Sequence, residues 1–331
     1  MTQVPSTVKL EHISCPNGCI QESKEVLKGR DRLHNLPGTF SIVRCPECGL
    51  ERTNPRPTPD TIGFYYPDEY GPYQATQTRA QTSGAKARIY SILGLEDRKL
   101  PKIPPGRMLE IGCSSGSYME YARDRGWEVE GIEFSPSVAD KARSKGFEVQ
   151  SGPVESASPP KNPFNVIVGW MVLEHLHQPI EVLRKLRSWT SRDGLLIVSV
   201  PDRDNIARRI FGSNSYDLQL PTHLFHFNPQ SLEKTLNTAG WKVERIFWQR
   251  NCNTLMKSIE YWATERDFRF TNRLINASKT GRISSHIRTL LGILLGITKQ
   301  SGRIEVWATP IDADKDKECN ENSVLAPHTQ H

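Results

Sequence analysis

The sequence Met-Leu-Glu-Ile-Gly-Cys-Ser-Ser-Gly at residues 108–116 constrains the fold of this chain more than any other stretch. An apolar run leads into a glycine-containing turn, a helical pattern follows, and a second apolar run at 128–133 ends on Glu133. This order is typical of a βαβ unit in a nucleotide-binding sheet. Glycines let the backbone come close to a ligand, and a carboxylate ending the second strand can accept hydrogen bonds from ribose hydroxyls. The pattern predicts an α/β fold with a nucleotide site.

The spacing of the glycines indicates which nucleotide is bound. A dinucleotide site needs Gly-x-Gly-x-x-Gly to hold a pyrophosphate, whereas this turn is Gly112-x-x-x-Gly116 and lacks the second glycine of that fingerprint. Glu110 ends the first strand, where its charge would repel phosphates but would suit the ammonium and sulfonium groups of S-adenosylmethionine. An NAD-dependent enzyme is therefore disfavoured, and a βαβ unit without a cofactor is the other alternative.

The same turn resembles the first motif of the class I S-adenosylmethionine-dependent methyltransferases, Glu/Asp-x-Gly-x-x-x-Gly. The family more often has glycine where Ser114 stands, which is a small departure. The resemblance implies S-adenosylmethionine as cofactor, with Glu110 at its methionine end and Glu133 at its ribose. Gly112, Ser114 and Gly116 would shape the turn around it.

From residue 107 onward, apolar runs alternate with helical patterns, which predicts a mainly parallel, Rossmann-like seven-stranded sheet. The last two strands are expected to form an antiparallel pair at the sheet edge. The expected strands are 108–111, 128–132, 147–150, 164–169, 194–200, 241–249 and 303–309, and the expected helices include 118–125, 179–190 and 228–239.

Ligands of open parallel sheets bind at the carboxyl ends of the strands. Glu155 follows the third strand and is expected near the adenine, while Trp170 and the residues after it follow the fourth strand and face the methionine or the methyl acceptor. The segment 164–179, with Val-Leu-Glu-His-Leu at 172–176, is similar to the corresponding motif of the small-molecule branch of these methyltransferases.

Three histidines are candidates for the chemistry. A hydroxyl acceptor must lose a proton, and a neutral imidazole can take it. We expect His223 to be the general base, with His175 or His226 orienting the acceptor; each of the three could instead be a packed structural residue. Related sugar C-methyltransferases have a glutamate before this histidine, whereas this chain has Thr222, which favours O-methylation.

Four cysteines near the N-terminus form a metal-binding pattern. Cys15 and Cys19 are separated by three residues, Cys45 and Cys48 by two, and 25 residues lie between the pairs. Two such knuckles bring four thiolates around a tetrahedral zinc ion and leave no open coordination position. The sequence therefore predicts a structural four-cysteine zinc site, with four ordinary reduced cysteines as the alternative.

These features divide the chain into a zinc module at 1–60, a Pro/Tyr-rich connector and helix at 61–100, a methyltransferase domain at 101–310 and a disordered tail at 311–331. The tyrosines of the connector either pack the zinc module onto the catalytic domain or cover the substrate pocket. They are Tyr65, Tyr66, Tyr70 and Tyr73.

The net charge of +6 is concentrated toward the C-terminus, because residues 241–310 hold twelve Lys/Arg against five Asp/Glu. No basic cluster interleaved with aromatic residues is present, so no nucleic-acid partner is expected. The apolar pattern at 283–297 is either a core helix laid on the sheet or an interfacial anchor, which would make 266–297 a peripheral membrane contact. The chain has no run of 18 apolar residues and no apolar leader. We expect a cytoplasmic protein, at most peripheral to the inner face of the membrane.

The zinc module, the connector that begins Asn-Pro-Arg-Pro-Thr at residue 54 and the tyrosines also resemble a subgroup that modifies sugars for polysaccharide or glycosylated-metabolite synthesis. The leading hypothesis is therefore O-methylation of a sugar or glycan hydroxyl. A quinone-like phenol or lipid-linked acceptor at a membrane surface, and a non-catalytic cofactor-binding adaptor, are the alternatives. The oligomeric state is left open.

Overall fold

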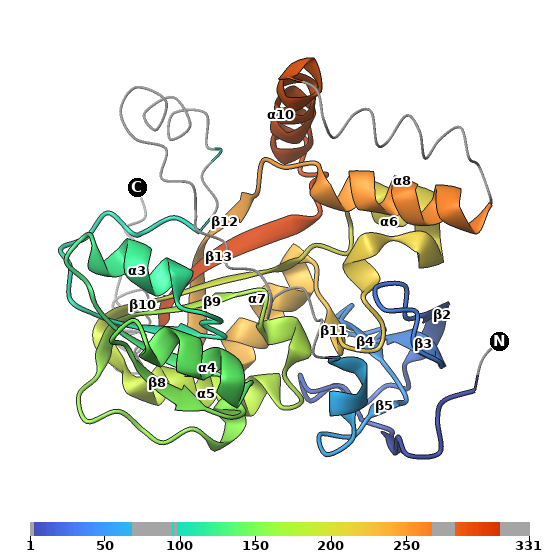
Figure 1. Ribbon diagram of the computed structural model, residues 1–331. Helices are drawn as coiled ribbons and strands as arrows, with labels where there is room; N and C mark the ends of the chain where they lie inside the picture. Colours follow the sequence, from blue (N-terminus) through green and yellow to red (C-terminus); the bar gives the residue numbers. More distant parts are fainter. Residues whose placement is uncertain (1–2, 68–94, 96–97, 267–281, 312–331) are drawn as a thin grey trace, which may run out of the picture.

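A computed structural model describes residues 3–67, 95, 98–266 and 282–311 of the chain, so the predicted tail beyond Ile311 lies outside the described residues. Its centre is a seven-stranded sheet with the order β12-β13-β10-β9-β6-β7-β8 (Figure 1). Every strand runs in one direction except β13, which lies antiparallel between β10 and β12. The predicted Rossmann-like seven-stranded fold is confirmed, including the antiparallel pair at the edge. The strands are β6 (Arg107–Ile111), β7 (Glu128–Glu133), β8 (Glu148–Ser151), β9 (Phe164–Trp170), β10 (Thr190–Pro201), β12 (Trp241–Trp248) and β13 (Arg303–Pro310).

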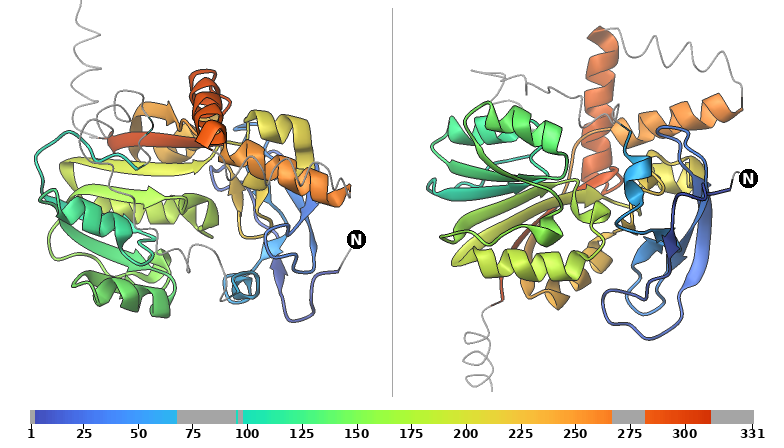
Figure 2. Two further views of the ribbon diagram at one scale, coloured as in Figure 1. Left: turned by 45° about the horizontal axis from the view of Figure 1, so that its top comes forward. Right: turned by 60° about the horizontal axis from the view of Figure 1, so that its bottom comes forward.

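Helices cover both faces of this sheet (Figure 2). Alternate residues of each strand face opposite sides, so that Val166 and Val168 of β9 join one core with α3 (Ser117–Arg123) and α4 (Pro136–Arg143). Ile167 joins the other core with α5 (Pro179–Trp189) and α7 (Pro229–Thr238). The strand order reverses between β6 and β9, which is where open α/β sheets bind their ligands.

The N-terminal region forms a second, four-stranded sheet with the order β11-β4-β3-β2. Three of its strands are β2 (Lys24–Arg30), β3 (Thr39–Arg44) and β4 (Glu51–Thr53). The fourth, β11 (Phe225–His226), comes from the part of the chain that forms the large sheet and pairs with β4. A further short pair joins β1 (Leu10–Glu11) to β5 (Arg56–Pro57). The two regions therefore share one sheet, and Leu50 and Ile62 lie in the main hydrophobic core.

A buried carboxylate holds this junction together. Glu51, 2% exposed, pairs with Arg203 at 3.1 Å and with Arg208 at 3.0 Å, and both arginines follow β10 of the large sheet. The more exposed Arg44 pairs with it at 2.6 Å. Buried charges need such partners, because an unpaired charge in a protein interior is costly.

One helix, α10 (Arg282–Ile297), stands away from the sheet at the top of Figure 1. Gly292 lies against the backbone of residues 250 and 251, where an added Cβ would come within 2.8 Å of Arg250 O. On another side of the helix, apolar side chains are 57–67% exposed: Ile287, Leu290, Leu294 and Ile297. The predicted alternative of a core helix laid on the sheet is therefore wrong. Within the described parts of the chain, no helix combines the length and apolar character needed to cross a bilayer.

We predict that Glu51→Ala lowers the free energy of unfolding by about 3–5 kcal/mol, because the largely buried Arg203 and Arg208 each lose their closest carboxylate. They keep the longer contacts to Asp204 at 3.5 Å and Asp217 at 3.4 Å. Arg44→Ala is the matched control, since a partly exposed ion pair contributes about 1 kcal/mol or less. Chemical denaturation of both variants measures the difference. Equal losses would show that the buried pairs do not stabilise the junction.

Candidate functional site

The turn between β6 and α3 has the open geometry that its sequence predicts. Gly112 and Gly116 have φ values of 65° and 78°, in the left-handed region that glycine tolerates best. Ser114 also lies there, with φ 49°, which gives a physical reason for glycine to be the commoner residue at this position. A Cβ on Gly112 would collide with Val172 of the loop after β9. The turn therefore keeps two strand ends close together.

Two carboxylates flank this turn. Glu133 Oε2 accepts a hydrogen bond from Ser114 N at 2.9 Å, and its Oε1 accepts one from Ser135 N at 3.0 Å. Each oxygen retains a lone pair for a ribose hydroxyl. Glu110 is 1% exposed, and its Oε2 has no hydrogen-bond partner among the described residues. Burial raises the pKa of Glu110 to about 8. A buried carboxylate with an unsatisfied oxygen fits a cationic ligand group, so both residues suit the cofactor that the sequence implies.

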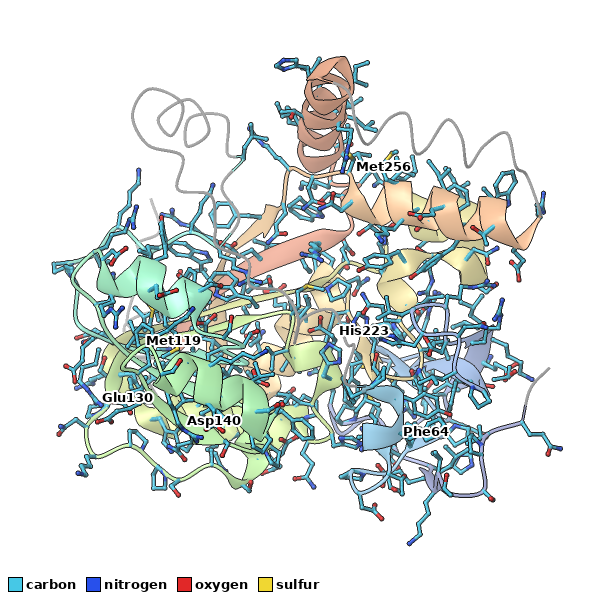
Figure 3. The ribbon with its side chains drawn as sticks, in the orientation of Figure 1. Phe64, Met119, Glu130, Asp140, His223 and Met256 are labelled. Carbon is cyan, nitrogen blue, oxygen red and sulfur yellow. The ribbon has the colours of Figure 1, made fainter. Side chains whose placement is uncertain are left out.

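A second group of side chains lies at the end of β9. Glu174 and His175 belong to the short helix η3 (Leu173–His175), and His223 precedes β11. Side-chain ligand atoms of the three residues lie within 4.8 Å of one another, and the two imidazole rings meet edge to face with centroids 4.7 Å apart. Figure 3 shows His223 between the large sheet and the N-terminal region. The structure thus brings together two of the three predicted histidines.

The hydrogen bonds of both rings fix which nitrogen carries hydrogen. His175 Nδ1 lies 2.9 Å from Thr222 O and His223 Nδ1 lies 2.7 Å from Asp217 O. A carbonyl oxygen only accepts, so each Nδ1 donates and each Nε2 keeps its lone pair. Burial lowers the pKa of His175 to about 4 and lowers that of His223 well below its ordinary value. Both rings are therefore neutral at pH 7.

Two of the connector tyrosines lie in different surroundings. Tyr65 packs against Phe40 in the N-terminal region and donates to Pro37 O at 2.8 Å. Tyr66 faces the site instead, with its Oη 2.9 Å from His175 Nδ1 and its ring 6.3 Å from Phe134, the residue after Glu133. Tyr70 and Tyr73 lie outside the described residues.

Three other predicted site residues lie apart from this group. Glu155 Oε1 accepts from His177 N at 3.2 Å. The Trp170 ring meets Tyr118 edge-on at 5.2 Å, on the face of α3. His226 lies in β11, where its Nε2 is 3.3 Å from Thr53 Oγ1. A surface hollow of about 180 Å³ lies against β7 and β8 and includes none of the predicted site residues.

Sequence reasoning did not assign a role to Glu174. Its side chain is fully buried, and both carboxylate oxygens are without hydrogen-bond partners within the described structure. Burial raises its pKa to about 8. Its position in the sequence could have identified it as a site residue, because it directly precedes His175 in a loop that follows a buried strand.

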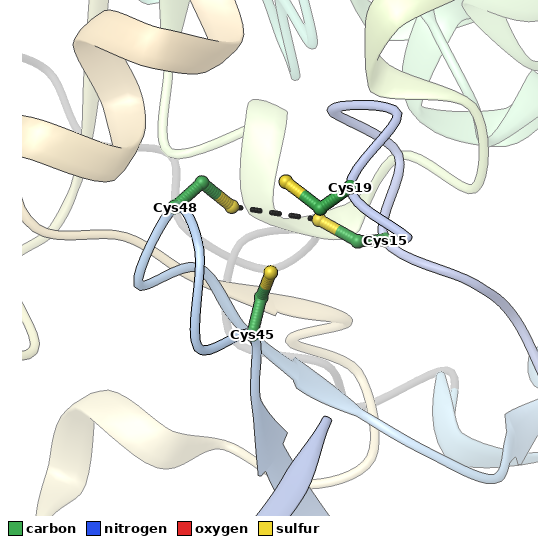
Figure 4. Close-up of side chains that lie close together, drawn as sticks. All are labelled: Cys15, Cys19, Cys45 and Cys48. Atoms are coloured by element: carbon green, nitrogen blue, oxygen red, sulfur yellow. Dashed lines mark hydrogen bonds between the residues drawn. The ribbon is translucent and has the colours of Figure 1, made fainter. Parts of the chain in front are cut away.

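The four N-terminal cysteines converge as their spacing predicts (Figure 4). Their sulfur atoms lie within 4.8 Å of one another, and Cys15 Sγ is 3.5 Å from Cys48 Sγ. Each knuckle is closed by a backbone hydrogen bond, from Gly18 N to Cys15 O and from Gly49 N to Cys45 O. Burial and the neighbouring sulfurs raise the pKa of Cys19 to about 12. Such crowded thiols ionise readily only around a cation, which fits a metal ion.

Comparison with known proteins agrees with this geometry. Residues 86–246 match the family model described as a methyltransferase domain. A ubiquinone biosynthesis O-methyltransferase of Xanthomonas campestris is 25% identical over 158 residues, which are 44% of this chain and 66% of the relative. A probable S-adenosylmethionine-dependent methyltransferase of Mycolicibacterium smegmatis is 26% identical over 140 residues, 41% of this chain and 52% of the relative. This chain thus spans less than two thirds of the length of these relatives.

A solved methyltransferase structure from Thermotoga maritima covers 44% of this chain and 68% of its own, with 23% identity and a TM-score of 0.37. The family match, the strand order and the glycine turn with its two carboxylates together define the class. Within residues 86–246, the chain has the sequence pattern and the fold of the class I S-adenosylmethionine-dependent methyltransferases.

The buried Glu110 predicts a pH dependence. The unfolded chain loses this proton near pH 4.3, whereas the folded protein keeps it to about pH 8. The folded state binds the extra proton across this window, so the free energy of unfolding of the cofactor-free protein falls as pH rises. Glu110→Gln has no ionisable group at this position and so removes this loss of stability. The variant should stabilise the cofactor-free protein at pH 8 by on the order of 2 kcal/mol or more.

The same Glu110→Gln variant should bind S-adenosylhomocysteine at least about tenfold more weakly, because the ammonium group loses a charged partner. Glu148→Gln, an exposed carboxylate on β8, is the control. Thermal unfolding from pH 5 to 9 and calorimetric titration provide both readouts. A variant that is neither more stable nor weaker in binding would contradict the assigned role of Glu110.

Proposed function

We propose that the protein transfers a methyl group from S-adenosylmethionine to a hydroxyl oxygen, with a sugar or glycan hydroxyl as the leading acceptor. The observation that carries this proposal is the His175–His223 pair, whose unprotonated nitrogens lie at the end of β9, beside the cofactor turn. The O-methyltransferase names of several relatives support oxygen as the acceptor atom.

Each residue has a distinct part in this proposal. The cofactor supplies a methyl group on a sulfonium, and its transfer is a direct displacement that needs an aligned acceptor. Glu110, Glu133 and the turn hold the cofactor. His223, fixed by its Nδ1–H bond to Asp217 O, presents Nε2 to receive the hydroxyl proton. His175, with Tyr66 Oη 2.9 Å from its Nδ1, orients the acceptor beside His223.

The first test is calorimetric titration with S-adenosylhomocysteine, with NAD as the control ligand. Micromolar binding of S-adenosylhomocysteine alone is expected, followed by methylation assays on nucleotide sugars, glycans and phenols. His223→Ala should lower turnover by roughly a hundredfold or more and leave S-adenosylhomocysteine affinity unchanged. Absence of binding would favour the non-catalytic adaptor, and normal turnover of His223→Ala would move the proton acceptor elsewhere.

We also propose that the four N-terminal cysteines hold one structural zinc ion. The buried Arg52 supports this, because its positive charge interacts with all four sulfur atoms. It would partly balance the excess negative charge of four thiolates around one zinc ion. Metal analysis should find one zinc per chain at this site, lost in Cys45→Ser but retained in Cys252→Ser, a buried cysteine outside the cluster. A folded Cys45→Ser protein with unchanged zinc content would contradict this site.

A quinone-like phenol or a lipid-linked acceptor at the inner membrane face is the second candidate. The exposed apolar side of α10 favours it, as do relatives named for ubiquinone biosynthesis. Such a helix can lie at a membrane interface and make peripheral contact. Co-sedimentation with anionic vesicles, compared with a Leu290→Ser/Leu294→Ser variant, distinguishes this candidate from a protein that works on free sugars.

A further inference from the structure

The cluster of Glu174, His175 and His223 has the composition of a metal site with open positions. Two imidazoles and one carboxylate converge within 4.8 Å, yet no hydrogen bond joins these side chains to one another in the described structure. The residues come from two loops that are far apart in the sequence, and a backbone hydrogen bond from Leu224 N to Glu174 O at 2.8 Å holds these loops together. The backbone therefore holds the three side chains close together.

Both imidazoles are oriented as metal ligands usually are. A ligating histidine normally donates its other ring N–H to a carbonyl or carboxylate, which fixes the tautomer. Here Thr222 O and Asp217 O accept hydrogen bonds from the two Nδ1–H groups, and each Nε2 keeps its lone pair. Tyr66 Oη, 2.9 Å from His175 Nδ1, adds a second contact behind one ring.

The buried Glu174 carboxylate is an independent observation that points to a cation. A fully buried carboxylate without partners is costly, and proteins retain one where a ligand completes it. Both oxygens of Glu174 are in this state. Ordinary core packing would leave this position apolar or would give the carboxylate backbone N–H donors, as Glu133 has from Ser114 and Ser135.

We propose that Glu174, His175 and His223 bind a divalent cation of the Mn²⁺, Co²⁺ or Zn²⁺ type, which is distinct from the zinc of the four cysteines. Nitrogen ligands favour these ions over Mg²⁺. Three protein ligands leave positions for acceptor oxygens, and such an ion lowers the pKa of a bound hydroxyl, whose proton then passes to water. This role in O-methylation rests on the proposed function, whereas the binding itself does not. With the ion bound, His223 Nε2 is its ligand; without the ion, the same nitrogen is the proton acceptor of the proposed function.

Manganese alone is a suitable probe, because a site of four thiolates prefers softer ions. We would titrate the intact, zinc-containing protein with Mn²⁺ and follow free Mn²⁺ by its electron paramagnetic resonance signal. One saturable Mn²⁺ per chain is expected, with affinity at least about tenfold weaker in Glu174→Gln and in His175→Gln. His177→Gln is the matched control, since His177 Nε2 lies 3.1 Å from Pro57 O, outside the cluster.

Calorimetric binding of S-adenosylhomocysteine to the same samples confirms that each variant is folded and separates the two proposals. Cofactor binding without saturable Mn²⁺ binding by the unmodified chain would overturn the metal site and leave the methyltransferase assignment intact. Mn²⁺ affinity that is equal in Glu174→Gln, His175→Gln and His177→Gln would also overturn it. Mn²⁺ binding without cofactor binding would retain the site and remove its role in methyl transfer.

Discussion

The pairing of β11 with β4 is the constraint on which the rest of the structure depends. Two residues of the methyltransferase region complete the sheet of the N-terminal region, and Glu51 beside them neutralises two buried arginines of the other part. The N-terminal region and the part of the chain that forms the large sheet therefore pack as one unit, and Leu50 and Ile62 of the N-terminal region lie in the main hydrophobic core.

This junction also positions the acceptor side of the site. Arg208 contacts Glu51 at 3.0 Å and Asp217 at 3.4 Å, and the backbone carbonyl of Asp217 orients the His223 ring. Thr53 of β4 donates to His223 O at 2.8 Å. A continuous set of polar contacts thus runs from the N-terminal sheet to the ring of His223.

Sequence reasoning succeeded where the signal is local. Buried parallel strands are continuous apolar runs, and the glycine turn has its own spacing, so the sheet, the cofactor turn and the two cysteine knuckles were predicted within a few residues. It failed where tertiary packing decides. A two-residue strand such as Phe225–His226 has no periodicity, and its partner lies more than 170 positions away. The carbonyl of Asp217 that orients His223 is backbone, which no side-chain pattern reveals.

The two unsatisfied carboxylates, Glu110 and Glu174, lie at the ends of neighbouring strands β6 and β9. Each destabilises the ligand-free protein, since burial without partners opposes folding. Both lie where the strand order reverses, which is where this fold places its ligands. A positively charged group beside either carboxylate would offset this cost, which is the physical reason for proposing a cofactor ammonium group at Glu110 and a metal ion at Glu174.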